Sequence, residues 1–526
     1  MAELDYRPGT TYQDWLLRPN LARKSVKAET ISLKMPLTSH NPGCSLDELR
    51  SEKLPKELFS LNTPFLTAPM QAISSPEMFA EIAKHGGLGV ANCSQPIESE
   101  VDMIRRTKRK KAGFVEPDVV SPDMTIDELA ELTKAKRYDT FPVTERGNPH
   151  GRLLGIITRN DYSKQEHSEL KVGARMVSIT DDRRQFVYAR LEELGDDEPL
   201  RTANRMLLDS HHGSMPIIDR EGNLHYMVFR RDIERHRDYP QASIDKKKRY
   251  LVGAAVNTHD YEKRVPAVVE AEADIIVVDS SQGYSEYQAD TIGFTKREFP
   301  WITLIGGNIV TAKGFNYLAS ALADVAKVGI GPGSICTTQH KFRMGMPMME
   351  ALKEVFDARN AFFEATGRYI PIIGDGGIVD NADIAIALTL CDAIMAGRYF
   401  ARFQESPTAV IDWEQTIDGV PFHASVKPYW GEGSARAQEW RAGRYRQATE
   451  TEGIEGVVPF AGRLSDPQNL PRTIDHLKIT MEKCGYSDIF ALNRYAELKL
   501  QSQSSKAQGM PHNIMTEGLW APYKVR

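Results

Sequence analysis

The chain has 526 residues and a formal net charge of -5, with 66 Lys and Arg side chains against 71 Asp and Glu. This length allows two to four domains at about 150 residues each. The charge balance leaves no overall basic field of the kind that binds nucleic acid or an anionic membrane, so we expect small-molecule ligands.

The N-terminal sequence and the cysteines indicate where the protein works. No apolar run approaches the ~20 residues that cross a bilayer, and MAELDYRPGTTYQ lacks the apolar core of a signal peptide. We therefore expect a cytoplasmic protein. The five cysteines are odd in number and lack CxxC spacing, which argues against a disulfide framework or a zinc site. They are Cys44, Cys93, Cys336, Cys391 and Cys484.

Short apolar runs alternate with segments of helical periodicity along most of the chain. Short continuous apolar strands between amphipathic helices predict an all-parallel sheet in an α/β fold. Eight such units favour a closed (β/α)8 TIM barrel over an open doubly wound sheet. The predicted strands are residues 64–70, 88–93, 251–257, 274–280, 303–308, 325–331, 370–377 and 393–400.

The alternation stops between the second and third predicted strands, where the chain contains an internal repeat. FPVTERGNPHGRLLGIITRNDY (141–162) and MPIIDREGNLHYMVFRRDI (215–233) each follow a helical stretch. The repeat resembles a pair of CBS motifs, which bind adenine nucleotides in many families. It implies a tandem CBS (Bateman) subdomain at 113–240, inserted between barrel parts at 1–112 and 241–526. A purely structural insertion is the alternative.

Two positions in each repeat bear on nucleotide binding. In CBS families a Thr or Ser and an Asp contact the ribose, and Thr158 and Asp161 match them. The second copy has Phe229 in place of the hydroxyl and keeps Asp232. We therefore expect at most one adenine or guanine nucleotide at the first repeat.

The stretch GIGPGSICTTQH places Cys336 behind three alternating glycines. Glycine permits positive φ and close backbone approach, so such a loop can direct N–H groups at an anion or carbonyls at a cation. A free cysteine is, however, more often a small buried residue than a reactive one. The stretch alone therefore leaves two interpretations of Cys336, a nucleophile or a buried thiol.

The motifs at the ends of the predicted strands resemble those of the IMP dehydrogenase / GMP reductase family. DSSQG, GGN, GIGPGSICTT, DGG, GRYFA and ESP occur in the family's order over almost the whole chain. RYLVGAAVNTHDY and YWGEGSARA look most like divergent IMP dehydrogenases of certain protozoa and bacteria. The resemblance implies NAD-dependent oxidation of IMP to XMP, the committed step towards guanine nucleotides.

The resemblance also implies the catalytic residues. Cys336 corresponds to the nucleophile that attacks C2 of the purine, and Thr338 to a hydroxyl that helps place the substrates and water. Arg444 and Tyr445 match a pair that activates water from a mobile flap, at about 429–456 here. Their register is open, and Arg441 is the next candidate.

A further group of residues matches the family's IMP site. Asp375 would bind the ribose hydroxyls, with a helix cap as its alternative role. Arg398 and glycine N–H groups would bind the phosphate, and Glu452 the N1 edge of the purine. Most relatives have Met at the position of Glu432. The implied substrate residues are Met70, Ser334, Asp375, Gly377, Gly397, Arg398, Tyr429, Gly431, Glu432, Gly433 and Glu452.

The dinucleotide and a cation complete the implied site. Asp279 would take the nicotinamide ribose, and His259 would stack on adenine unless it is only a surface residue. The implied NAD+ residues are Asp279, Ser280, Ser281, His259, Asn308, Gly329 and Gly331. Relatives commonly bind K+ through carbonyls, here of Gly331, Gly333 and Cys336. A neighbouring subunit's Glu-Gly-Gly completes that site, and this chain has Gln508, Gly509 and Met510 instead.

Assembly and two rival functions complete the expectations. The family forms homotetramers, and in some members octamers through the CBS pairs. GMP reductase, an NADPH-dependent deaminase of GMP, is the first rival. DSSQG and the Arg-Tyr pair oppose it. A catalytically silent nucleotide sensor is the second, and it would leave the retained Cys336 and Asp375 without a role.

Overall fold

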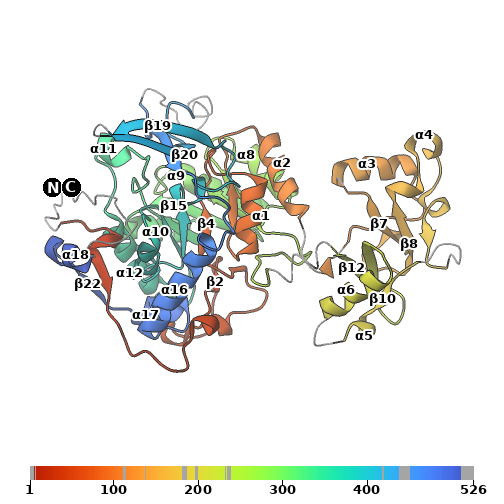
Figure 1. Ribbon diagram of the computed structural model, residues 1–526, viewed down its shortest axis with the longest axis horizontal. Helices are drawn as coiled ribbons and strands as arrows, with labels where there is room; N and C mark the ends of the chain where they lie inside the picture. Colours follow the sequence, from red (N-terminus) through yellow and green to blue (C-terminus); the bar gives the residue numbers. More distant parts are fainter. Residues whose placement is uncertain are drawn as a thin grey trace. The chain divides into compact units, whose positions relative to one another are not determined.

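The computed structural model describes residues 5, 8–110, 114–115, 117–136, 138–180, 186–195, 199–230, 233, 239–417, 420–437 and 450–510. The chain forms two compact units (Figure 1). We call them the barrel unit, Met1–Ile82, Gly87–Asp102 and Gly253–Arg526, and the inserted unit, Ala83–Gly86 and Met103–Val252.

The barrel unit is built around eight parallel strands, which confirms the predicted TIM barrel. The sheet runs β4-β18-β17-β16-β15-β14-β13-β5. It closes where Leu66 of β4 pairs with Leu88 and the Thr67 amide donates to the Leu88 carbonyl at 3.1 Å. The strands are β4 Phe65–Thr67, β5 Gly89–Ala91, β13 Val252–Val256, β14 Ile275–Val278, β15 Thr303–Ile309, β16 Val325–Val328, β17 Ile372–Asp375 and β18 Ala393–Ala396.

Helices follow the strands and cover the barrel from outside (Figure 1), which is why the strands are mostly apolar and almost entirely buried. Every residue of β13, β14, β16 and β18 is buried. The helices are α1 Pro76–Lys84, α2 Ile97–Lys108, α8 Tyr261–Glu270, α9 Glu286–Glu298, α10 Ala312–Ser320, α11 Thr338–Phe342, α12 Met348–Thr366, α13 Asn381–Ala387 and α14 Arg398–Ala401.

The barrel unit contains further strands and helices besides the eight barrel strands and their helices. An antiparallel sheet of β19 Ile411–Ile417, β20 Val420–Trp430 and β21 Glu455–Pro459 follows the last barrel helix. The two ends of the chain meet where β1 pairs with β22. The remaining elements are β1 Trp15–Leu17, β2 Met35–Pro36, β3 Ser60–Leu61, α16 Leu470–Cys484, α17 Ile489–Tyr495, β22 Leu498–Leu500 and α18 Gln503–Gly509.

The inserted unit contains two sheets, β7-β8-β9 and β10-β11-β12-β6. Each sequence repeat forms a helix followed by an antiparallel hairpin, α3 with β7–β8 and α6 with β11–β12. The bounds are β6 Phe114–Val115, α3 Ile126–Lys136, β7 Thr140–Thr144, β8 Leu153–Thr158, α4 Lys164–His167, β9 Val177–Ser178, β10 Ala189–Arg190, α5 Leu191–Leu194, α6 Pro199–Asp209, β11 Ser214–Ile218 and β12 Leu224–Phe229.

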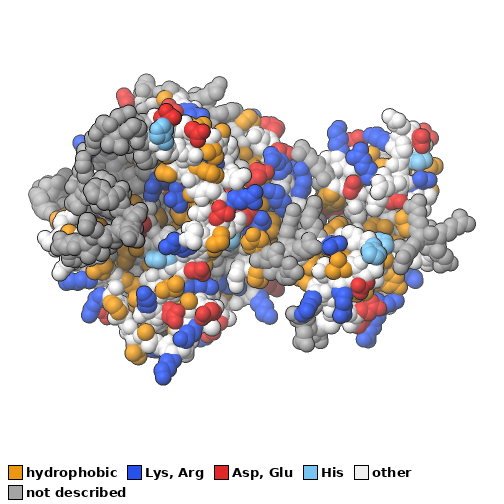
Figure 2. Space-filling model, viewed as in Figure 1, with side chains coloured by type: hydrophobic (Ala, Val, Ile, Leu, Met, Phe, Trp, Pro, Cys, Tyr) orange, Lys and Arg blue, Asp and Glu red, His pale blue; other side chains and the backbone are white. Residues whose placement is uncertain are grey.

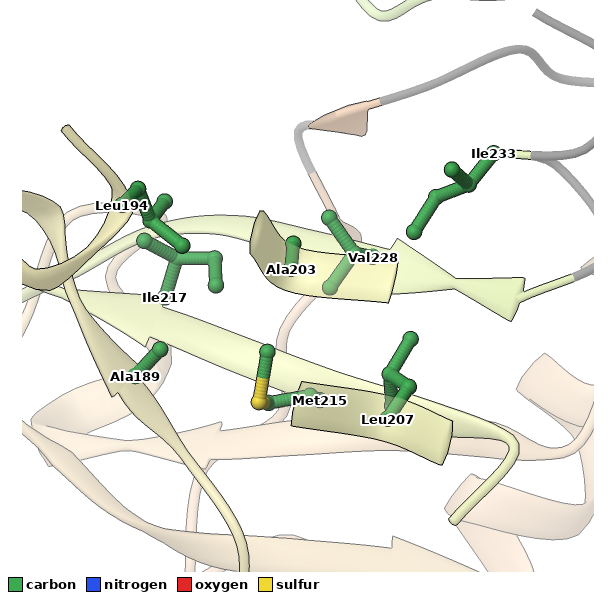
Figure 3. Packing of buried hydrophobic residues seen from close by; sticks show 8 residues of the cluster. All are labelled: Ala189, Leu194, Ala203, Leu207, Met215, Ile217, Val228 and Ile233. Carbon is green, nitrogen blue, oxygen red and sulfur yellow. The ribbon is translucent and has the colours of Figure 1, made fainter. Parts of the chain in front are cut away.

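Each half of the inserted unit has its own apolar core. In the second half, Ala203 and Leu207 of α6 pack on Met215 and Ile217 of β11 and on Val228 of β12 (Figure 3). The two halves contact each other at their hairpin turns. There Arg152 and Asn223 form an antiparallel β-bridge, and the Leu224 amide donates to the Gly151 carbonyl at 3.0 Å. The repeat therefore folds as two similar modules, while its assignment as a CBS pair stays a prediction.

Charged side chains of both signs lie on the face of the molecule that Figure 2 shows. Acidic and basic side chains are interspersed on the visible face (Figure 2), in keeping with the near-balance of charge. Among the helices that the structure describes, none is long and apolar enough to cross a bilayer.

Candidate active site

A cavity of about 200 Å³ opens at the carboxyl ends of the barrel strands. Active sites of TIM barrels form at this end because eight loops converge there. Its lining residues come from the ends of five strands and from both ends of the predicted flap, about 429–456. They are Ala68, Pro69, Met70, Asp279, Ser280, Ser281, Asn308, Lys327, Gly329, Ile330, Gly331, Ile335, Cys336, Thr338, Asp375, Gly431, Glu432, Gly433 and Glu452.

The loop after β16 presents Cys336 to this cavity. Gly329 has φ 139° and Gly331 has φ 83°, and a Cβ at Gly329 would lie 2.3 Å from the Asp375 carbonyl. Glycine is therefore required for the loop to turn here. Cys336 is exposed, whereas Cys391 is fully buried and its pKa is raised by burial. The interpretation of Cys336 as a small buried thiol is wrong, and its exposure suits a nucleophile.

Cys336 stands at one end of a chain of polar contacts. Its Sγ lies 3.2 Å from the Thr338 Oγ1, and that hydroxyl donates to the Glu452 Oε2 at 3.0 Å. Because a hydroxyl has one proton to donate, the Thr338 oxygen is left to accept from the thiol. The geometry offers a path for a proton from the thiol to a carboxylate.

Backbone hydrogen bonds fix Glu452 beside the cysteine loop. The Thr337 amide donates to the Glu452 carbonyl at 3.0 Å, and the Ile454 amide donates to the Ile335 carbonyl at 2.9 Å. On its other side the Glu452 amide donates to the Gly433 carbonyl at 2.9 Å. The segment 452–454 thus lies between the cysteine loop and the turn at 431–433. Arg441, Arg444 and Tyr445 lie outside the described residues.

Asp375 is held by two donors at the end of β17. Its Oδ2 accepts from the Asn308 Nδ2 at 2.8 Å and from the Lys327 Nζ at 2.9 Å. The helix-cap alternative for Asp375 is wrong, because Asp380 caps α13 with bonds to Ala382 and Asp383. The other carboxylate oxygen of Asp375 suits a ribose hydroxyl.

Lys327 is the one charged lining residue that the sequence analysis missed. Its side chain is almost fully buried, with 2% exposure, and a buried lysine requires a charged or polar partner. The available signal was a lysine in the middle of the apolar strand VAKVGIG.

The residues predicted to bind the phosphate do not line this cavity; they are Ser334, Gly377, Gly397 and Arg398. A Cβ at Gly397 would lie 2.6 Å from the Tyr429 hydroxyl, so glycine allows that close approach. Tyr429 also contacts the Met70 sulfur at 3.8 Å and hydrogen-bonds with Ser334, and burial raises its pKa. Arg398 donates to the Val379 carbonyl at 2.9 Å. Gly377 turns with φ 78°.

Glu432 is anchored from the loop after β4. Its Oε1 accepts from the Gln71 amide at 2.7 Å, and the Gln71 side chain accepts from the Trp430 indole at 3.0 Å. These bonds hold the carboxylate at the cavity wall.

The predicted NAD+ residues divide into two groups. Asp279, Ser280, Ser281 and Asn308 line the cavity, so a carboxylate suited to ribose hydroxyls lies in the same cavity as Cys336. His259 is exposed and lies outside the lining.

The residues predicted for K+ also divide. Gly331 and Cys336 lie in the cavity wall, and the Gly333 carbonyl accepts from the Cys336 amide at 3.0 Å. Gln508, Gly509 and Met510 are exposed at the end of α18 and do not line the cavity.

The sequence of this chain is similar to known proteins over most of its length. Residues 9–512 match the family model described as the IMP dehydrogenase / GMP reductase domain. The inosine-5'-monophosphate dehydrogenase of Tritrichomonas foetus is 37% identical over 524 residues, covering 98% of both chains. That of Methanocaldococcus jannaschii is 33% identical, covering 86% of this chain and 89% of its own.

A solved structure extends the comparison. A Cys-to-Ala variant of the GMP reductase of Trypanosoma brucei, in complex with guanosine 5'-monophosphate, matches with a TM-score of 0.70 and 25% identity. The match covers 97% of this chain and 98% of that one.

Proposed function

The chain is an enzyme of the IMP dehydrogenase / GMP reductase family, and we propose that it oxidises IMP to XMP with NAD+ as the hydride acceptor. One observation carries the proposal. A single cavity is lined by the exposed Cys336, its Thr338–Glu452 contact chain, Asp375 and Asp279. These groups suit a purine nucleotide and a dinucleotide bound side by side.

The first half of the proposed reaction forms a covalent intermediate. The Cys336 sulfur attacks C2 of IMP as a thiolate, the reactive form of cysteine. The thiol proton leaves through Thr338 to Glu452. Asp375 holds the ribose, with its carboxylate fixed by Lys327 and Asn308. The hydride on C2 passes to C4 of the nicotinamide, whose ribose Asp279 would bind, and a thioimidate remains on Cys336.

The second half hydrolyses that intermediate. Water adds to C2, the C–S bond breaks, and XMP leaves with the thiolate of Cys336 restored. We propose Arg444 and Tyr445 as the pair that activates this water, with Arg441 the next candidate. Arginine has a pKa above ~12, so the site must either stabilise a small neutral fraction of this side chain or couple proton removal to attack by the water. The overall balance is IMP, NAD+ and water to XMP, NADH and one proton.

Further features of the family enter the proposal as expectations. K+ would bind the carbonyls of Gly331, Gly333 and Cys336. A neighbouring chain would complete the site with Gln508, Gly509 and Met510, which lack the Glu carboxylate and would bind K+ more weakly. We expect a cytoplasmic homotetramer, with an octamer as its alternative. An adenine or guanine nucleotide is expected at the first CBS repeat.

Thr158 and Asp161, the residues expected to contact a nucleotide ribose in the first CBS repeat, contact each other. Thr158 donates from both its amide and its hydroxyl to the Asp161 Oδ2, each at 2.8 Å. The two residues that would contact a ribose are therefore already paired with each other, and a nucleotide would have to share or replace these bonds.

GMP reduction is the second candidate, because the matched solved structure is a GMP reductase. The two reactions use opposite redox directions and different substrates. The purified chain should reduce NAD+ with IMP and should not oxidise NADPH with GMP. The opposite pair of results would replace the proposal with GMP reduction.

The role of Cys336 has its own test. Replacing Cys336 with Ala should abolish turnover while IMP still binds with nearly the same affinity in calorimetry. Cys44→Ala, at a half-buried thiol outside the cavity, is the matched control and should keep full activity. Undiminished turnover of the Cys336 variant would refute covalent catalysis.

A further inference from the structure

A buried arginine lies between two carboxylates on the side of the barrel next to the predicted NAD+ site. The Arg264 side chain is 5% exposed and that of Glu100 is 0% exposed. The Arg264 Nη1 donates to the Glu100 Oε2 at 2.5 Å. The Arg264 Nε and Nη2 donate to the Asp260 carboxylate, with distances of 3.1 and 2.8 Å to its Oδ2. Such a forked arrangement fixes direction as well as charge.

This cluster joins three segments of the barrel unit. Glu100 belongs to α2, Arg264 to α8, and the Arg264 Nη2 also donates to the Gln95 carbonyl in the turn after β5, at 3.1 Å. Burial raises the pKa of Glu100 to about 8, against the attraction of Arg264. The guanidinium lies between the two carboxyl groups, and each of them accepts a hydrogen bond from it.

Asp260 connects the cluster to the loop after β13. The Asn257 Oδ1 accepts from the His259 amide at 2.7 Å and from the Asp260 amide at 3.0 Å. This makes 257–260 a compact turn that ends in the residue clamped by Arg264. The turn therefore cannot shift without breaking the forked ion pair.

The same turn starts beside the predicted nicotinamide end of the dinucleotide. The Asp279 amide donates to the carbonyl of Val256, the last residue of β13, at 2.8 Å. Asp279 is thus held next to the first residue of the turn, and His259 projects from the turn as an exposed side chain.

We propose that Arg264 is a positioning residue for the dinucleotide, holding the 257–260 turn so that His259 meets the adenosine half of NAD+. The inference rests on the proposed function. Arg264 itself is buried and does not line the cavity. A change at Arg264 should therefore alter kcat/KM only for hydride acceptors that contain an adenosine.

The test compares two hydride acceptors in Arg264→Lys, where lysine keeps the charge but loses the fork. NAD+ carries the adenosine, and oxidised nicotinamide mononucleotide lacks it. We expect kcat/KM for NAD+ to fall about tenfold, since stacking of one base on an aromatic side chain is worth about that factor. The value for the mononucleotide should stay within about twofold, and so should KM for IMP.

Two further variants separate positioning from general stability. His259→Ala should show the same selective loss, and the double variant should lose little more than either single one, because both act through one contact. Arg359→Lys is the matched control, since Arg359 is a buried arginine paired with Asp392 at 3.2 Å. It should leave the ratio between the two acceptors unchanged.

The outcomes are distinct. An equal loss with both acceptors, or no loss in Arg264→Lys, would overturn the positioning role. A wild-type chain that reduces neither acceptor with IMP would instead overturn the proposed function on which it rests.

Discussion

The contact chain from Cys336 through Thr338 to Glu452 predicts the effect of one conservative substitution. Thr338→Val replaces the hydroxyl with a methyl group of similar size at a site that is 3% exposed. It removes the 3.2 Å contact with sulfur and the 3.0 Å bond to the carboxylate. The shape of the site stays nearly the same, so the change isolates the hydroxyl.

The size of the effect follows from these two contacts. A hydrogen bond to a charged group contributes about 2 kcal/mol and a neutral one about 1 kcal/mol. If both are used in the transition state, their loss of about 3 kcal/mol lowers kcat by about a hundredfold.

Thr337→Val supplies the control. The Thr337 Oγ1 is buried and has no hydrogen-bond partner among the described residues, so its removal should leave kcat unchanged. The assay is steady-state NADH formation from IMP for both variants. A kcat for Thr338→Val within about twofold of wild type would refute the proton path, because it would mean that the lost contacts contribute less than about 0.5 kcal/mol to the barrier.

Three further predictions follow from other parts of the structure. Lys327→Met leaves the Asp375 carboxylate without its buried ammonium partner, so urea unfolding should show a loss of about 3 kcal/mol for the barrel unit; a loss below about 1 kcal/mol would contradict this. Burial raises the pKa of Glu100 from its ordinary 4.5 to about 8 in the folded chain. Between these two pH values the folded chain binds a proton that the unfolded chain has released, so the free energy of unfolding decreases as the pH rises from about 4.5 to about 8. Glu100→Gln should flatten this decline in urea midpoints, and an unchanged decline would contradict it. Because Gln508, Gly509 and Met510 replace the relatives' Glu-Gly-Gly, turnover should depend little on KCl compared with LiCl, and steep saturable activation by KCl would contradict it.

The sequence predicted the barrel well because its strands are buried on both faces. Seven of the eight predicted apolar runs contain the whole of an observed barrel strand, and the run at 303–308 ends one residue before β15 does. Apart from β15, the observed strands are shorter than the runs, since the residues after each strand form the loops of the active-site face. The antiparallel sheet that flanks the flap, and the pairing of β1 with β22, join distant segments and left no local pattern to detect.

The candidate site was predictable only in part. Local sequence could not decide whether Cys336 is exposed, because exposure depends on how the loop packs against β17 and the segment 452–454. Thr338 and Glu452 are 114 residues apart in the chain, and no spacing rule connects them. Family resemblance supplied both residues, and the structure supplied their contact.

Lys327 shows the converse case. The lysine in an apolar strand was visible in the sequence, but its partners Asn308 and Asp375 come from two other strands. Its meaning depends on the order of strands around the barrel. Charged residues inside predicted buried strands are therefore worth examining for partners at the strand ends.

The most direct test of the proposed reaction follows the hydrogen on C2 of IMP. With IMP deuterated at C2 and unlabelled NAD+, the account predicts one deuterium at C4 of the reduced nicotinamide and none in XMP, measured by mass spectrometry of both products. Reduced dinucleotide without the label, or label released to water, would contradict transfer of the C2 hydride from a purine held on Cys336.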